Sequence, residues 1–202
     1  MVNDSKETLT DMDNRKRENP SSVRSKSLLK KAFLSLLQDE PLASISVSQI
    51  CSQAQLTRPT FYNHFDSKEA IAAAMVDDIL EGFSEHMRQS KVGSTQDMLR
   101  LFLDYWESQW GLLQLLSNNG LLPLVGERFK PHLERIYETM PFTNKEWDEE
   151  ELAFHNAFLA AGMTGMLDHW ARSGSKTGAA QLTAYMEHMI ATLDAGMGRR
   201  RS

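Results

Sequence analysis

The stretch from Gln55 to Lys68 gathers side chains that can contact a nucleic acid. Its polar members are a cation, two hydroxyls, an amide and an imidazole: Arg58, Thr60, Tyr62, Asn63 and His64. In protein–DNA complexes, groups of these types read base edges and bind phosphates. Phe61 and Phe65 are four residues apart, so they share the opposite face of a helix. The stretch therefore predicts a short helix with an apolar inner face and a hydrogen-bonding outer face.

Local signals bound this helix at both ends. Thr57 is a suitable N-cap, because its hydroxyl can accept from an unpaired amide of the first helical turn. Pro59 falls in that first turn, where its missing N–H costs little. Asp66, with Glu69 three residues later, predicts that Asp66 caps the next helix.

A second short helix is expected just before this one. Ser46 and Gln49 form a capping-box pattern, and apolar residues follow at helical spacing: Val47, Ile50, Cys51 and Ala54. Two short helices joined by a tight turn describe a helix-turn-helix unit whose second helix is the reader. Gln55 stands where a turn glycine is usual, which implies some strain if its φ is positive. Two helices of any all-α protein can pack in this way, so the pattern alone leaves that simpler interpretation open.

Residues 24–70 resemble the DNA-binding domain of the TetR family of bacterial transcriptional regulators. The resemblance rests above all on Tyr62-x-x-Phe65-x-x-Lys68 after a helix-turn-helix pattern, and it covers about a quarter of the chain. It implies that Arg58, Thr60 and Asn63 read bases while Tyr62, His64 and Lys68 contact phosphates. The full set of candidate DNA-binding residues is Arg24, Ser46, Thr57, Arg58, Pro59, Thr60, Tyr62, Asn63, His64 and Lys68.

The distribution of charge supports a basic module on an acidic body. The chain has a formal net charge of −5. Residues 1–68 hold 10 Lys and Arg against 8 Asp and Glu, whereas residues 69–202 hold 12 against 19. A basic module on an acidic body is what a small DNA-contacting surface on a larger regulatory domain would give.

Composition limits the other classes of function. The single cysteine, Cys51, allows no disulfide framework and suits a reducing cytoplasm; a buried, inert thiol is favoured over a redox sensor. No apolar run is long enough for a membrane span, and the N-terminus lacks the apolar core of a signal peptide, so a cytoplasmic protein without membrane partners is expected. No nucleophile–base pairing, metal-ligand spacing or glycine-rich phosphate loop is visible, so no enzyme activity, metal or cofactor is expected.

Three regions are expected along the chain. Residues 1–20 are predicted to be a disordered basic tail, in which Arg15, Lys16 and Arg17 are either an arm to DNA phosphates or simply solvated. Residues 21–68 form the helix-turn-helix domain, and residues 69–202 form a helical regulatory and dimerisation domain. The expected fold is all-α, with about nine helices.

The expected helices of the larger domain follow from apolar spacing and from Gly and Pro. They span residues 67–89, 95–117, 121–125, a segment after Pro131, 145–173 and 179–195. Gly82 weakens the centre of the helix expected over residues 67–89. It is therefore a candidate flexible point between the helix-turn-helix domain and the larger domain.

An aromatic row on the 95–117 helix has two interpretations. Phe102, Trp106 and Trp110 recur every four residues, and they form either one wall of a ligand cavity or ordinary core. The candidate ligand contacts are Phe102, Trp106, Trp110, His155, Phe158 and Met163. His155 alone is more typical of a satisfied structural histidine.

The last two long helices are candidates for a dimer interface. Small side chains in the first would let another helix approach closely, and the last helix carries a long apolar stripe. The resemblance implies a four-helix interface between two copies; alternatively, both faces are consumed within one chain. The candidate interface residues are Ala161, Gly165, Leu182, Tyr185, Met186 and Met189.

These patterns and the resemblance together favour a dimeric transcriptional repressor. Its expected partners are double-stranded DNA with a palindromic operator, a second copy of the chain, and an unidentified small, largely apolar molecule that releases it from DNA. The alternative is a DNA-binding dimer with no small ligand, controlled by a protein partner or constitutive.

Overall fold

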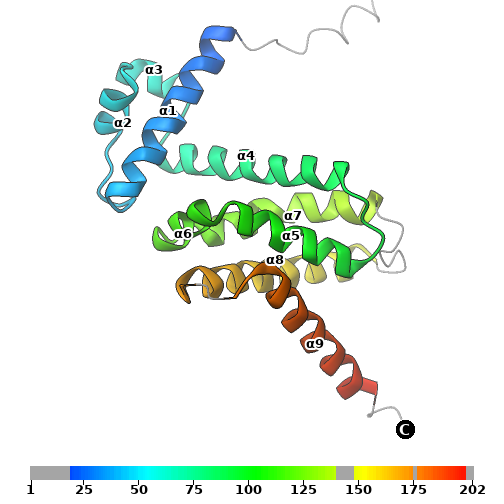
Figure 1. Ribbon diagram of the computed structural model, residues 1–202. Helices are drawn as coiled ribbons and strands as arrows, with labels where there is room; N and C mark the ends of the chain where they lie inside the picture. Colours follow the sequence, from blue (N-terminus) through cyan, green and yellow to red (C-terminus); the bar gives the residue numbers. More distant parts are fainter. Residues whose placement is uncertain (1–18, 140–147, 175–176, 199–202) are drawn as a thin grey trace, which may run out of the picture. The chain divides into compact units, whose positions relative to one another are not determined.

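The computed structural model describes residues 19–139, 148–174 and 177–198, and the regular elements in this part are all α-helices (Figure 1). The expectation of an all-α fold is therefore confirmed. The helices are α1 (Pro20–Asp39), α2 (Val47–Ala54), α3 (Arg58–Tyr62), α4 (Lys68–Gln89), α5 (Thr95–Ser108), α6 (Trp110–Asn118), α7 (Leu122–Thr139), α8 (Glu149–Arg172) and α9 (Ala179–Gly198). Arg15, Lys16 and Arg17 of the expected tail lie outside the described residues. None of the described helices combines the length and apolar character that crossing a bilayer would need.

The chain divides into two compact units. The first comprises residues 1–40 and 44–71, and the second comprises residues 41–43 and 72–202. In the first unit, α1 packs on α2 and α2 on α3. Its core consists of fully or nearly fully buried side chains from all three helices and the segments between them: Leu29, Phe33, Leu37, Ile45, Ile50, Phe61 and Phe65. The first unit therefore has its own apolar core.

Aromatic side chains form the centre of the second unit. The rings of Phe83, Phe102 and Phe129 lie 5.6 to 6.1 Å apart and come from α4, α5 and α7. Trp106 extends this cluster and is 1% exposed. Offset and edge-to-face arrangements of this kind add to the stability that burial of the rings provides.

Two helix boundaries of the second unit differ from the sequence-based expectation. The single helix expected over residues 95–117 is broken at Gln109, where α5 ends and α6 begins. Trp110 therefore leaves the row of Phe102 and Trp106 and packs edge-on against Trp170 of α8, with ring centroids 5.1 Å apart. The two short helices expected around Pro131 are one continuous helix, α7, with Pro131 inside it.

Polar contacts join the helices of the second unit. Glu107 of α5 accepts from the amide of Ala179 at 3.0 Å and so caps the start of α9. Ser117 of α6 donates to Asp168 of α8 at 2.6 Å, and this hydrogen bond, with the Arg172 guanidinium, holds the pKa of the Asp168 carboxyl below its ordinary value. These contacts fix the ends of α6, α8 and α9.

Gly82 has a packing role in addition to its conformational freedom. The hydroxyl of Tyr105 donates to the carbonyl of Ile79 at 2.8 Å, and it would lie only 2.9 Å from a Cβ at position 82. The next nearest atom, the Tyr105 ring carbon Cζ, lies at 3.9 Å. Glycine at position 82 therefore makes room for one oxygen atom.

We expect Gly82→Ala to destabilise the protein by about 1 kcal/mol, because the lost hydrogen bond and the displaced ring outweigh the helix propensity of alanine. In a Tyr105→Phe background, which lacks the oxygen, the same substitution should instead be stabilising by up to about 1 kcal/mol. Gly111→Ala in α6 is the control, since a Cβ there meets no atom within 4 Å. Thermal unfolding of the four variants and the wild type measures the effect; equal effects of Gly82→Ala in both backgrounds would contradict this role.

Candidate nucleic-acid interface

The first helix of the predicted pair is fixed by a reciprocal cap. The Ser46 hydroxyl accepts from the amide of Gln49 at 3.2 Å, while the Gln49 side-chain oxygen accepts from the amide of Ser46 at 2.8 Å. The predicted capping box is thus confirmed. Because the Ser46 hydroxyl also donates to Gln49, at 2.6 Å, it is engaged within the domain.

The buried face of α2 includes Cys51, which is 4% exposed. Burial raises the pKa of its thiol above the ordinary value, with a smaller opposing effect of Arg58. The thiol is therefore protonated at neutral pH and a poor nucleophile.

The turn between α2 and α3 passes through a left-handed residue. Gln55 has φ 55° and ψ 40° and is the one non-glycine residue with positive φ in the described part of the chain. Its backbone geometry lets the amide of Leu56 donate to the carbonyl of Cys51 at 2.9 Å, which closes the C-terminus of α2. The strain expected at this position is present.

Replacing Gln55 by glycine is expected to stabilise the protein by about 0.5–1 kcal/mol, since glycine adopts positive φ without a steric penalty. Gln55→Val should be destabilising, because a β-branched side chain is excluded from this conformation. Thermal unfolding of both variants checks the sign, and a Gln55→Gly variant less stable than wild type would show that the Gln55 side chain contributes more than the strain removes.

The second helix, α3, begins as the sequence predicts. The Thr57 hydroxyl accepts from the amide of Thr60 at 3.3 Å, and Pro59 lies in the first turn. Phe61 is fully buried and Phe65 nearly so, with ring centroids 6.2 Å apart. The apolar face of α3 is thereby anchored in the core of the first unit.

The outer face of α3 presents hydrogen-bonding groups. Arg58, Tyr62 and Asn63 are exposed, whereas Thr60 and His64 are half-buried. Tyr62 lies one turn after Arg58, and the interaction of its hydroxyl with the guanidinium raises the pKa of Arg58 above its ordinary value. The i, i+4 spacing of the two residues is visible in the sequence. The Thr60 hydroxyl lies 2.8 Å from that of Thr57 and is shared with the cap.

The remaining candidates in this unit have different roles. Arg24 is exposed on α1. Lys68 is half-buried, and its ammonium donates to the carbonyl of Ile45 at 2.8 Å, which ties the start of α4 to the segment before α2. This bond has no signal in the sequence; the phosphate contact predicted for Lys68 stays a prediction. The first turn of α4 is capped by Ser67 and not by Asp66 as expected, because the Ser67 hydroxyl accepts from the amide of Ala70 at 3.2 Å.

The candidate ligand contacts lie in different environments of the second unit. Phe102 and Trp106 are buried in the aromatic cluster, and Trp110 is half-buried against Trp170. On α8, His155 and Met163 are half-buried, but Phe158 is 75% exposed. Burial lowers the pKa of His155 below its ordinary value. The structure thus brings Phe102 and Trp106 together and separates Phe158 from them.

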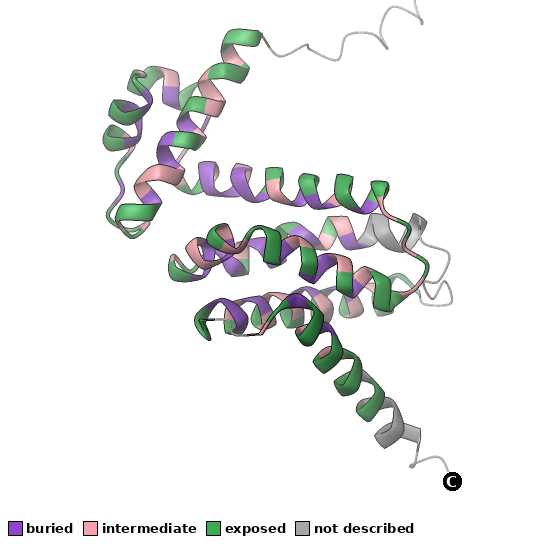
Figure 2. Cartoon of the chain, in the orientation of Figure 1, coloured by how far each residue is buried: buried purple, intermediate pink, exposed green. Residues whose placement is uncertain are grey.

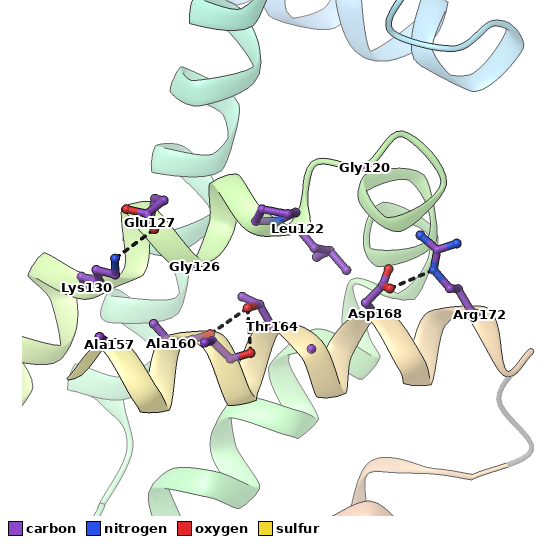
Figure 3. Close-up of a pocket in the computed structure, with 13 residues that line it drawn as sticks. Gly120, Leu122, Gly126, Glu127, Lys130, Ala157, Ala160, Thr164, Asp168 and Arg172 are labelled. Carbon is purple, nitrogen blue, oxygen red and sulfur yellow. Dashed lines mark hydrogen bonds and ion pairs between the residues drawn. The ribbon is translucent and has the colours of Figure 1, made fainter. Parts of the chain in front are cut away.

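A cavity of about 430 Å³ lies between α7 and α8 (Figure 3), and none of these six candidates lines it. Its floor is made of small side chains of α8, among them Ala161 and Gly165. The ion pair Glu127–Lys130 lies at one end and the pair Asp168–Arg172 at the other. The charges at both ends are paired, and the described residues hold no cluster of acidic, histidine or cysteine side chains suited to a metal ion.

The candidate interface residues on α8 and α9 are mostly exposed, as Figure 2 shows for the described part of α9. Ala161, Gly165, Tyr185 and Met189 are exposed, and Leu182 and Met186 are half-buried. Phe154, which is not among the candidates predicted from the sequence, is 71% exposed and lies one turn before Phe158. The four-residue spacing of these two phenylalanines could have indicated a shared face.

Comparison with known proteins identifies the first unit. The family model described as bacterial regulatory proteins, tetR family, matches residues 30–75. The transcriptional regulator EthR of Mycobacterium tuberculosis is 47% identical over 45 residues, which cover 22% of this chain and 21% of EthR. This chain therefore aligns with about a fifth of the length of that relative.

Two solved structures share the fold over most of the chain. Lin0861 from Listeria innocua has a TM-score of 0.71 at 16% identity, covering 87% of this chain and 93% of its own. A TetR transcriptional regulator from Streptococcus agalactiae has a TM-score of 0.57 at 22% identity, covering 91% and 98%. The match at residues 30–75 shows that this segment belongs to the bacterial regulatory proteins of the tetR family, and the two solved structures show the fold that the chain shares with them.

Proposed function

We propose that this protein is a sequence-specific DNA-binding transcriptional regulator that acts as a dimer, most simply a repressor released from its operator by a small molecule. The observation that carries the proposal is the outer face of α3, where Arg58, Tyr62 and Asn63 are exposed while Phe61 is buried behind them. A rigid helix with this composition can enter the major groove and make direct base contacts.

The side chains on the outer face of α3 have two different expected roles, base contact and phosphate contact. Arg58 and Asn63 carry the side-chain types that form bidentate contacts with guanine and adenine. Tyr62 and His64 are suited to phosphates, whose contacts set the register without reading sequence. Lys68 supports the reader indirectly, because its bond to Ile45 ties the start of α4 to the segment before α2.

Dimerisation is supported by the exposed apolar surface of α8 and α9. Phe154, Phe158, Tyr185 and Met189 are between 48% and 75% exposed in the single chain. Apolar side chains gathered in this way are typical of an interface.

Selection of bound sequences from random duplex DNA tests the proposal. We expect a palindromic site with half-sites about one helical turn, roughly 34–36 Å, apart. Its affinity should fall with salt at a slope of about −0.9 per neutralised phosphate. Failure to enrich any sequence at low salt would reject the proposed reader face.

A DNA-binding dimer without a small ligand is the second candidate. The burial of Phe102 and Trp106 within a packed aromatic cluster favours it, because these rings already contact one another. A protein partner or constitutive binding would then replace the effector. Whether a small molecule binds inside the second unit decides between this candidate and the ligand-released repressor.

A further inference from the structure

Three polar side chains are buried in the described part of the chain: Ser117, Asn156 and Thr183. Ser117 donates to Asp168 at 2.6 Å, and Thr183 donates to the carbonyl of Ala179 at 2.9 Å. Asn156 is 2% exposed, and neither its amide nitrogen nor its carbonyl oxygen has a hydrogen-bond partner. Asn156 is therefore the exception among the buried polar groups.

An unpaired buried amide destabilises the fold, because it gives up its hydrogen bonds to water and gains none in return. Nearly all buried polar groups in native proteins are paired, so an unpaired one calls for a partner from outside the chain or for a functional role. Leucine has a similar shape and could occupy position 156 without this penalty. The presence of asparagine instead points to a partner that is not part of the chain.

Asn156 shares its face of α8 with buried apolar residues. Helical spacing places it on the inner face of α8 with Ala160 and Leu167, both of which are buried. This face packs on α7, and the approach is close: a Cβ at Gly126 would lie 3.6 Å from the carbonyl oxygen of Ala160. On α7, Phe129 is buried within the aromatic cluster.

The titratable residue next to Asn156 in the sequence, His155, is neutral. His155 is half-buried, and burial lowers its pKa below the ordinary value, so its imidazole is uncharged at neutral pH. A charged ligand group brought to a buried position loses its hydration, which costs more free energy than the burial of a neutral group. The two unpaired amide atoms of Asn156 are therefore best matched by a neutral partner.

We propose that Asn156 is the polar anchor of the effector site and that it selects neutral molecules with an amide head, a carbonyl beside an N–H, on an apolar body. This inference rests on the proposed function, in which a small molecule bound by the second unit controls DNA binding. The Asn156 nitrogen donates to the ligand carbonyl, and its oxygen accepts from the ligand N–H. A carboxylate offers acceptors alone and leaves the Asn156 oxygen unpaired.

Two substitutions test the first part of the inference without any ligand. Asn156→Leu should raise the melting temperature of the full chain by about 2–10 °C, because it removes an unpaired amide and keeps the volume filled. Thr183→Val, which removes a paired hydroxyl of the same unit, should lower the melting temperature. If the melting temperature of Asn156→Leu does not rise, the amide is satisfied in solution and the proposal is overturned.

Binding of defined amides tests the second part. In a ¹H–¹⁵N spectrum of the full chain, the Asn156 side-chain signals are the pair absent from Asn156→Leu. We would titrate caprolactam, benzamide and octanamide, each against its N-methylated tertiary amide. At least one of the three should shift the Asn156 signals saturably, with binding at least about tenfold weaker for its tertiary amide. Binding to Asn156→Leu, followed by the backbone amide signals of the second unit, should be weaker by a similar factor.

No shift with any of the three amides, or equal binding of the tertiary amides, would overturn the proposal. Because neither measurement involves DNA, its failure is distinct from failure of the proposed function, which the DNA selection decides.

Discussion

Replacing Arg58 by alanine is expected to weaken binding to the selected operator by about 10²- to 10⁴-fold and to relax the preference at one base pair of each half-site. A bidentate arginine contact contributes about 1–3 kcal/mol of discrimination, and a dimer makes it twice. Arg58 is exposed on the outer face of α3, where its guanidinium can reach a base edge. Fluorescence anisotropy with the selected site and with single-base variants measures both effects.

The control for charge is Arg100→Ala. Arg100 is an exposed arginine of α5, paired with Asp104 in the second unit, so its removal changes the net charge equally without touching α3. It should leave the affinity within about a factor of two at moderate salt, because an exposed pair contributes little. If Arg58→Ala and Arg100→Ala behaved alike, α3 would not be the reader.

Tyr62→Phe separates the two roles of the outer face. The ring that packs edge-on against Phe61 is kept, with centroids 5.2 Å apart in the wild type, and only the hydroxyl is removed. A phosphate then loses a donor. We expect a smaller loss of affinity that is similar for every DNA sequence, which distinguishes a phosphate contact from base reading.

The helix-turn-helix unit could be predicted from the sequence because its boundaries are set by local chemistry. The capping pair Ser46 and Gln49, the cap at Thr57 and the proline at position 59 act within one helical turn of themselves. The buried Phe61 and Phe65 follow from their spacing alone. Nothing distant in the chain is needed to place these residues.

The larger unit was harder to predict because distant contacts decide its helix ends. The break at Gln109 turns Trp110 toward Trp170, which lies 60 residues later in the chain. Pro131 removes one amide donor, yet α7 continues through it and packs extensively along α8. Tertiary packing here overrides the local signal that proline gives.

The same limit applies to the candidate sites of the second unit. Periodicity indicated that Phe158 belongs to an apolar helix, but only the packing of α8 on α6 and α7 determines that it points to the surface. The unpaired amide of Asn156 has no sequence signal, because a polar residue on an apolar face is visible only once its possible partners are placed.

Phe158→Ser is expected to raise the dissociation constant of the dimer by about 30- to 1000-fold. The side chain is 75% exposed in the single chain, and its burial in a two-fold interface would contribute about 1–2 kcal/mol from each copy. The stability of the single chain should hardly change, since an exposed ring makes few contacts to lose. Sedimentation at several concentrations measures the dimer directly, and thermal unfolding at low concentration measures the fold.

The loss of the dimer should carry a loss of DNA binding, because one reader helix alone spans one half-site. Phe158→Ser should therefore bind the palindrome weakly at concentrations where it is monomeric and recover as concentration rises. Val23→Ser, an exposed apolar residue of α1, is the control for the sedimentation assay and should leave the dimer intact. A Phe158→Ser protein that dimerises like wild type would place the interface away from this face of α8, and the exposed pair Phe154 and Phe158 would then need a different partner.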